Sequence, residues 1–111
     1  MIQWPAIIKH DGEDELIYIH SKKHWLEDEE MLLYIFSERD VLIDATGKVF
    51  PLKELQQDIE HSNYLVEASL DNIVELIQHH ASIVGNCCSS KIQTENILAA
   101  IEMVRTIKQE S

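Results

Sequence analysis

Hydrophobic residues recur with a helical period between Leu70 and Val84. Their spacings of three and four residues place them on one stripe, while most charged and amide side chains fall away from it. Ser69 is a residue type that caps helix N-termini, and Gly85-Asn86 tolerates the positive φ that often ends a helix. The pattern therefore predicts an amphipathic helix against which the other elements pack. Its stripe consists of Leu70, Ile73, Val74, Ile77, Ala81 and Val84.

A second helical pattern occupies the C-terminal end of the chain. Thr94 is its expected N-cap, and one apolar face runs on to the end of the sequence. Leu98 and Met103 lie off this face, so they either cover another part of the core or form a dimer contact. The face consists of Ile97, Ala100, Ile101, Val104 and Ile107.

The first twenty residues predict a β-hairpin. Ile2–His10 and Leu16–His20 are rich in isoleucine, and Asp11-Gly12 between them is a strong turn signal. Pro5 cannot donate a ladder hydrogen bond, so the first strand is expected to lie at the sheet edge or to be interrupted there. The expected buried side carries Trp4, Ile8, Ile17 and Ile19.

A second hairpin is predicted around Gly47, which stands where a tight turn needs positive φ. Val41–Asp44 and Lys48–Phe50 are its strands. Pro51 then suits the first turn of a short helix that carries Leu52, Leu55 and Ile59. Tyr64–Ala68 is expected to lead into the long helix.

Ser21–Asp40 is ambiguous. Ser21 or Asp28 could cap a helix, and the acidic residues before Met31 suit a helix N-terminus. In a helix, Trp25, Leu32 and Phe36 would share a face. Leu33–Phe36 alone would also make a respectable strand. We favour the helix.

The order of elements, strands early and helices late, predicts an α+β fold. With 111 residues and only three glycines and two prolines, the chain is expected to form one domain over residues 1–111. N-terminal antiparallel hairpins would pack on C-terminal amphipathic helices. A compact chain of this length has a radius of gyration of about 13 Å.

Three stretches of this sequence resemble a small family of acidic bacterial proteins without an assigned function. They are MIQWPAIIKH at the start, DVLIDATGKVF in the second hairpin and GNCCSSK before the last helix. The resemblance covers nearly the whole chain. It implies a single domain and a bacterial source, and it carries over no active site.

The formal net charge of −11 limits the possible partners. A surface this acidic repels phosphate groups, so nucleic acid and anionic membranes are poor partners. Solubility or a basic protein partner explains the charge better, and a solvated acidic surface is favoured over a dedicated docking face. The longest apolar run, Met31–Phe36, is far shorter than the ~20 residues that span a bilayer. No signal-peptide pattern is visible at the N-terminus, and a cytoplasmic location is expected.

The adjacent cysteines Cys87 and Cys88 are the most unusual feature of the sequence. They cannot form a relaxed disulfide with each other and lack the spacing of a thioredoxin-type motif. Packing in a buried space is one interpretation, with both thiols reduced and slow to react. Alternatively, the thiols and His79 or His80 could meet across the turn at Gly85 and bind a soft metal.

Other chemistry has little support in the sequence. His10, His20, His24 and His61 have no paired metal-ligand spacing, and His80 is expected to be half-buried at the rim of the helix stripe. The chain contains no GxSxG motif and no Gly-rich phosphate loop. No catalytic residue or cofactor is therefore assigned, and enzymatic activity is not favoured.

Two hypotheses remain. The first is a non-enzymatic interaction or regulatory module that binds a protein partner or a second copy of itself. The alternative is a small thiol or metal site built on Cys87, Cys88 and His79 or His80.

Overall fold

The computed structural model describes residues 2–85 and 92–110, which form five strands and five helices. The strands are β1 (Ala6–Lys9), β2 (Leu16–Ile19), β3 (Val41–Ile43), β4 (Lys48–Pro51) and β5 (Val66–Glu67). The helices are α1 (Lys22–Glu27), α2 (Glu29–Leu33), α3 (Leu52–Gln57), α4 (Leu70–Ile83) and α5 (Ile97–Glu110).

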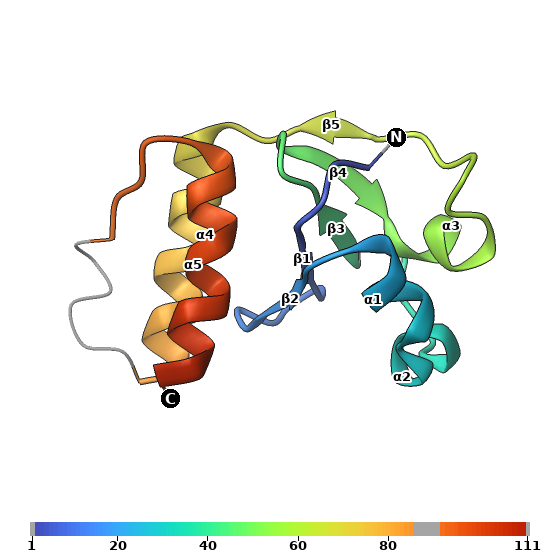
Figure 1. The fold of residues 1–111 in the computed structure, drawn as a ribbon, viewed down its shortest axis with the longest axis horizontal. Coiled ribbons are helices and arrows are strands. Elements are labelled where there is room, and N and C mark those ends of the chain that lie inside the picture. Colours follow the sequence, from blue (N-terminus) through green and yellow to red (C-terminus); the bar gives the residue numbers. More distant parts are fainter. Residues whose placement is uncertain (1, 86–91, 111) are drawn as a thin grey trace.

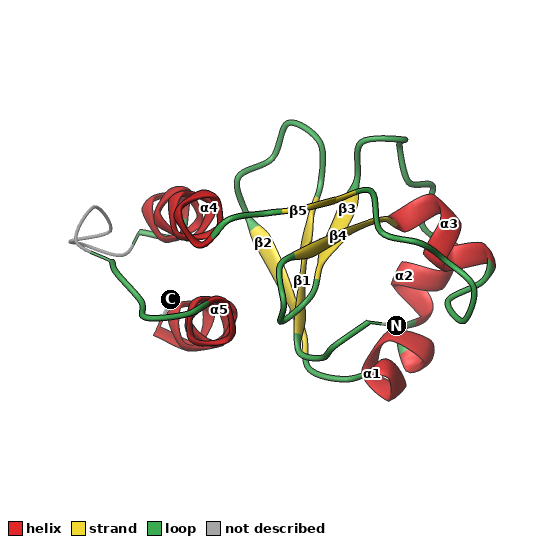
Figure 2. Ribbon diagram, turned by 90° about the horizontal axis from the view of Figure 1, so that it is seen from above, coloured by secondary structure: helices red, strands yellow, loops and turns green. Residues whose placement is uncertain are grey.

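The strands form one antiparallel sheet in the order β2-β1-β3-β4-β5. The sheet lies between two groups of helices, with α4 and α5 on one side and α1, α2 and α3 on the other (Figures 1 and 2). The predicted α+β class and both predicted hairpins are confirmed. The radius of gyration is 13.3 Å, close to the value expected for a compact chain of this length.

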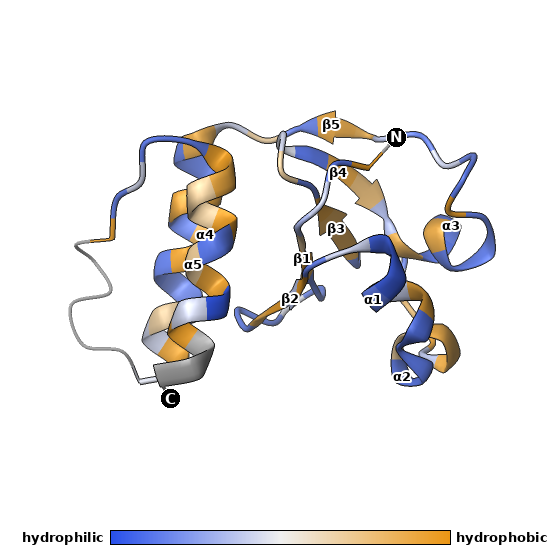
Figure 3. Cartoon of the chain, in the orientation of Figure 1, coloured by the Kyte–Doolittle hydropathy of each residue, from blue (hydrophilic) through white to orange (hydrophobic). Residues whose placement is uncertain are grey.

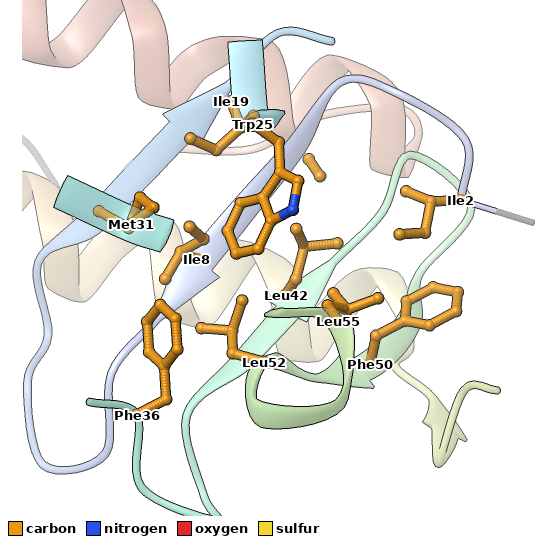
Figure 4. Close-up of a cluster of buried hydrophobic side chains, with 11 residues drawn as sticks. Ile2, Ile8, Ile19, Trp25, Met31, Phe36, Leu42, Phe50, Leu52 and Leu55 are labelled. Carbon is orange, nitrogen blue, oxygen red and sulfur yellow. The ribbon is translucent and has the colours of Figure 1, made fainter. Parts of the chain in front are cut away.

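Each face of the sheet is covered by its own hydrophobic core. Adjacent residues of β1 point to opposite faces, so that Ile8 enters one core and Ile7 the other. Burial on both faces explains why β1 and β3 are almost continuously apolar rather than alternating. The first core, on the side of α1–α3, contains Ile2, Ala6, Ile8, Ile19, Trp25, Met31, Phe36, Leu42, Phe50, Leu52 and Leu55 (Figure 4). The second contains Ile7, Leu16, Ile43, Ile73, Ile77, Ala81, Ala100, Ile101, Val104 and Ile107.

The long helix agrees with its prediction. The Ser69 hydroxyl accepts from the backbone N–H of Asn72, and the Asn72 side chain accepts from the backbone N–H of Ser69, which makes a capping box. Ile73 and Ile77 are fully buried, whereas Leu70 and Val74 are half-buried. Gly85 follows with a φ of 84°.

Pro5 predicted that the first strand lies at the sheet edge or is interrupted there. The strand is not at the edge. It lies between β2 and β3, and it begins at Ala6, directly after Pro5. The proline therefore stops the strand without removing a donor from the ladder. On its buried side Ile8 and Ile19 are fully buried, while Trp4 and Ile17 pack against the first core from partly exposed positions.

Residues 21–40 contain two short helices rather than one long one. Ser21 caps α1 and Asp28 caps α2, because each side chain accepts from the backbone N–H three residues later. Each helix buries one large side chain, Trp25 from α1 and Met31 from α2. The alternative strand at Leu33–Phe36 is not formed.

Tyr64–Ala68 leads into α4 as expected, and it also contains β5, which pairs with β4. One other expectation was wrong. The N-cap of α5 is Asn96 rather than Thr94, because the Asn96 side-chain oxygen accepts from the backbone N–H of Ala99 at 2.8 Å. None of the described helices is long and apolar enough to cross a membrane.

Candidate interaction surface

The residues of the predicted thiol or metal site are only partly described. Cys87 and Cys88 lie outside the described residues, so this hypothesis stays a prediction. His79 is exposed on α4, whereas His80 is fully buried rather than half-buried. The Nδ1 atom of His80 accepts a hydrogen bond of 2.8 Å from the backbone N–H of Leu16. This bond ties α4 to the start of β2.

The other histidines are dispersed over the fold. His10 stacks on Phe36, and its Nδ1 atom lies 3.5 Å from a carboxylate oxygen of Asp40. His24 accepts from the backbone N–H of His20 at 3.1 Å, and His61 contacts Asp58. Within residues 2–85 and 92–110, no three His, Cys, Asp or Glu side chains are grouped so that they could hold a metal ion.

The most exposed large apolar side chains follow each other closely at the end of α2. Leu33 has an exposed fraction of 83% and Ile35 of 91%, and Leu32 and Tyr34 are also exposed. We call residues 32–35 the apolar segment. In Figure 3 the hydrophobic colour extends from the end of α2 into the stretch that follows, at the margin of the molecule. Contiguous exposed apolar side chains are typical of binding surfaces, whereas isolated ones are common everywhere.

Gln56 of α3 holds the apolar segment. Its side-chain nitrogen donates to the backbone carbonyls of Met31, Leu32 and Tyr34 at 3.0, 2.9 and 2.7 Å. All three partners are acceptors, so the nitrogen of the amide, and not its oxygen, faces the segment. One side chain thus satisfies carbonyls at the C-terminal end of α2 that have no partner inside the helix.

Buried side chains fix both ends of the same segment. Met31 precedes it and Phe36 follows it, and both belong to the first core (Figure 4). The ring of Tyr34, within the segment, contacts the rings of Phe36 and His10, with centroid distances of 4.9 and 5.0 Å. The exposed side chains are therefore carried by backbone that is anchored on each side.

Asp40 anchors the turn after Phe36. Its two carboxylate oxygens accept from the backbone N–H groups of Asp11 and Ser37 at 2.7 and 2.8 Å. Burial alone raises the pKa of this carboxyl, but the hydrogen bonds from Asp11, Ser37 and His10 outweigh burial and hold the pKa below its ordinary value. Asp40 therefore stays ionised and joins the segment to the turn of the first hairpin.

A hollow of about 390 Å³ lies beside α3. Glu38, three residues after Ile35, lines it together with Glu54, and Lys53 is its single cation. We call it the acidic hollow; its complete lining is Glu38, Pro51, Lys53, Glu54, Gln57 and Leu65. Since Gln56 of α3 contacts the apolar segment and Gln57 lines the hollow, α3 joins the two features.

The sequence pattern did not identify this surface. Helical spacing placed Leu32 with Trp25 and Phe36 on one buried face, but Leu32 is exposed because the helix is broken at Asp28 and ends at Leu33. A signal was present in the length of the apolar run. Six consecutive apolar residues, Met31–Phe36, exceed what one side of so short a helix can bury.

These features define a small α+β domain with an anchored, exposed apolar segment. The chain belongs to the DUF4144 family, described as a protein structure with unknown function, whose sequence profile matches residues 4–104. No curated protein matches the sequence significantly. The NMR structure of a protein from Shewanella amazonensis is similar in fold, with a TM-score of 0.72 and 24% sequence identity. The match covers 96% of this chain and 90% of that one.

Proposed function

We propose that this protein is a non-enzymatic interaction module that binds a protein partner through its apolar segment. The observation that carries the proposal is the exposure of Leu33 and Ile35 on backbone that buried neighbours and Gln56 hold in place. An exposed side chain on a mobile loop must be ordered on binding, which costs free energy. On an anchored segment most of that cost is already met by folding.

Stability gives no reason for two such side chains at these positions. Leu33 and Ile35 contribute almost nothing to the core, and they expose apolar surface that favours aggregation. A partner that covers them would gain about 25 cal/mol for each Å² of apolar surface removed from water. This gain supports a binding role over a structural one.

Co-purification with a matched pair of double variants tests the proposal. L33S/I35S removes the apolar segment's two most exposed side chains, and I83S/L98S removes two exposed apolar side chains from α4 and α5. Both variants are expected to melt close to the wild type, since none of the four side chains is buried. Tagged proteins would then be compared in a bacterial lysate by quantitative mass spectrometry.

The expected result is a specific partner that the wild type and I83S/L98S retain and L33S/I35S loses. If all three proteins retained the same partners in the same amounts, the apolar segment would not be the binding surface. A large fall in the melting temperature of L33S/I35S alone would assign the two residues to folding instead.

A further inference from the structure

We propose that the partner of this surface is a cationic amphipathic peptide segment, with apolar side chains on Leu33 and Ile35 and a lysine or arginine in the acidic hollow. The inference rests on the proposed function and specifies the chemistry of its partner. It follows from charges that surround the apolar segment and are left unpaired by the fold.

The charges around the apolar segment are mainly negative. Glu29 and Glu30 precede it on α2 and Glu38 follows it, while Arg39 is the only base between residues 27 and 40. Among the described residues, these three glutamates and Glu54 form no hydrogen bond or ion pair through their carboxylates. By contrast, the carboxylates of Asp28 and Asp40 are used in capping α2 and anchoring the turn. The fold therefore leaves a set of carboxylates available to an external cation.

The shape of the surface suits a long basic side chain. Lysine and arginine lay an apolar stem along hydrophobic surface and keep the charged group at its end in a polar site. Glu38 of the acidic hollow comes three residues after Ile35, a span of at most about 11 Å, so one peptide can reach both. At about 390 Å³ the hollow has room for such a side chain, and Glu38 and Glu54 provide its counter-charge.

The negative charge also disfavours a second copy of the chain and phosphate groups as occupants of this surface. A second copy of this chain would bring another net charge of −11 against the same acidic surface, and phosphate groups would be repelled in the same way. A cationic peptide gains from both the apolar contact and the long-range attraction, which also speeds its association at low salt.

Titration of the full-length ¹⁵N-labelled protein with three blocked hexapeptides tests the inference. Each has two central leucines, flanked on both sides by two lysines, two glutamines or two glutamates. The lysine peptide is expected to shift the backbone amide signals of residues 32–35, Glu38 and Glu54. At low salt it should bind roughly fivefold more tightly than the glutamine peptide, and the glutamate peptide should bind least. High salt should remove most of the difference between the lysine and glutamine peptides.

Two charge variants locate the effect. E38Q/E54Q should bind the lysine and glutamine peptides alike, whereas E75Q/E95Q makes the same change in net charge at exposed positions elsewhere and should keep the preference. L33S/I35S should lose the shifts with every peptide. These substitutions are all on exposed side chains, so folding is expected to be unaffected.

The outcomes separate the two proposals. Equal binding of the lysine and glutamine peptides to the wild type at residues 32–35 would overturn the cationic partner and leave the interaction module standing. A preference for lysine that E38Q/E54Q keeps, or shifts confined to other surfaces, would overturn it too, as would no binding at all. Dimerisation abolished by L33S/I35S would assign the surface to a second copy. The proposed function is judged separately, by the co-purified partner.

Discussion

Loss of the Gln56 side chain is expected to destabilise the apolar segment, because its amide binds three backbone carbonyls there. Replacing it with alanine removes all three contacts while leaving the helix propensity of α3 slightly improved. We expect Gln56→Ala to destabilise the domain and to loosen residues 31–36. The neighbouring Gln57→Ala is the matched control, since Gln57 is exposed on the same helix and makes none of these contacts.

The magnitude follows from the number of protons available. The amide group has two N–H protons for three carbonyls, so it forms at most two full hydrogen bonds, with the third contact shared. At about 0.5–1.5 kcal/mol for each net bond, the upper limit is about 3 kcal/mol. Leu32 and Tyr34 are exposed, so water can replace part of the loss at their carbonyls. We therefore expect Gln56→Ala to lower the free energy of unfolding by about 1–2 kcal/mol.

Urea unfolding and amide exchange measure the two parts of this prediction. The unfolding midpoint of Gln56→Ala should fall below that of Gln57→Ala, with no change in slope. The amide of Leu32, which donates to the Asp28 carbonyl in α2, should exchange faster in Gln56→Ala. Identical midpoints and identical exchange in the two variants would refute the claim that Gln56 holds the segment.

Three further outcomes are expected. Ile77→Ala should lower the free energy of unfolding by roughly 2–5 kcal/mol, because the side chain is fully buried in the second core; melting together with the wild type would contradict this. Folding lowers the pKa of Asp40, so its contribution to stability is present above the unfolded-state pKa and is lost as the pH falls through the folded value. The free energy of unfolding should therefore fall less steeply with decreasing pH in Asp40→Asn than in the wild type. Burial, then the hydrogen bond to Glu102, raises the pKa of Tyr18 from 10.0 to about 12, so its contribution is present below pH 10 and is lost as the pH rises to about 12. The difference in absorbance titration between the wild type and Tyr18→Phe should show this ionisation, and a midpoint near 10 would contradict it.

The parts of the fold that sequence predicted well are those with local signals. The central helix combined a strong apolar period with a Ser69 cap and a following glycine, and the second hairpin was marked by Gly47, whose φ is 92°. Such signals act within a few residues and need no knowledge of the partner elements.

The errors concern properties that depend on distant contacts. The position of β1 inside the sheet depends on its pairing with β3, more than thirty residues away, which the proline in the preceding loop does not reveal. The cap of α5 was misplaced by two residues because threonine and asparagine are both good capping types, and the sequence does not show which of them precedes the first turn. The apolar segment was missed for the same reason, since Gln56 lies more than twenty residues from the carbonyls it binds.

The division of the protein into two cores has a consequence for its synthesis. Every residue of the first core lies between Ile2 and Leu55, whereas the second core needs residues as late as Ile107. Because the chain is made from its N-terminus at roughly 5–20 residues per second, we expect the N-terminal half to acquire its core before α5 has left the ribosome. Crosslinking of stalled nascent chains would test this, and an N-terminal half without compact structure before α5 emerges would contradict it. If this order holds, the apolar segment and Gln56 reach their folded positions before α5 does, and a partner could bind the nascent chain. Until α4 and α5 are made, the side of the sheet that bears Ile7 and Ile43 has no cover. We expect this exposed apolar face to be a binding site for chaperones.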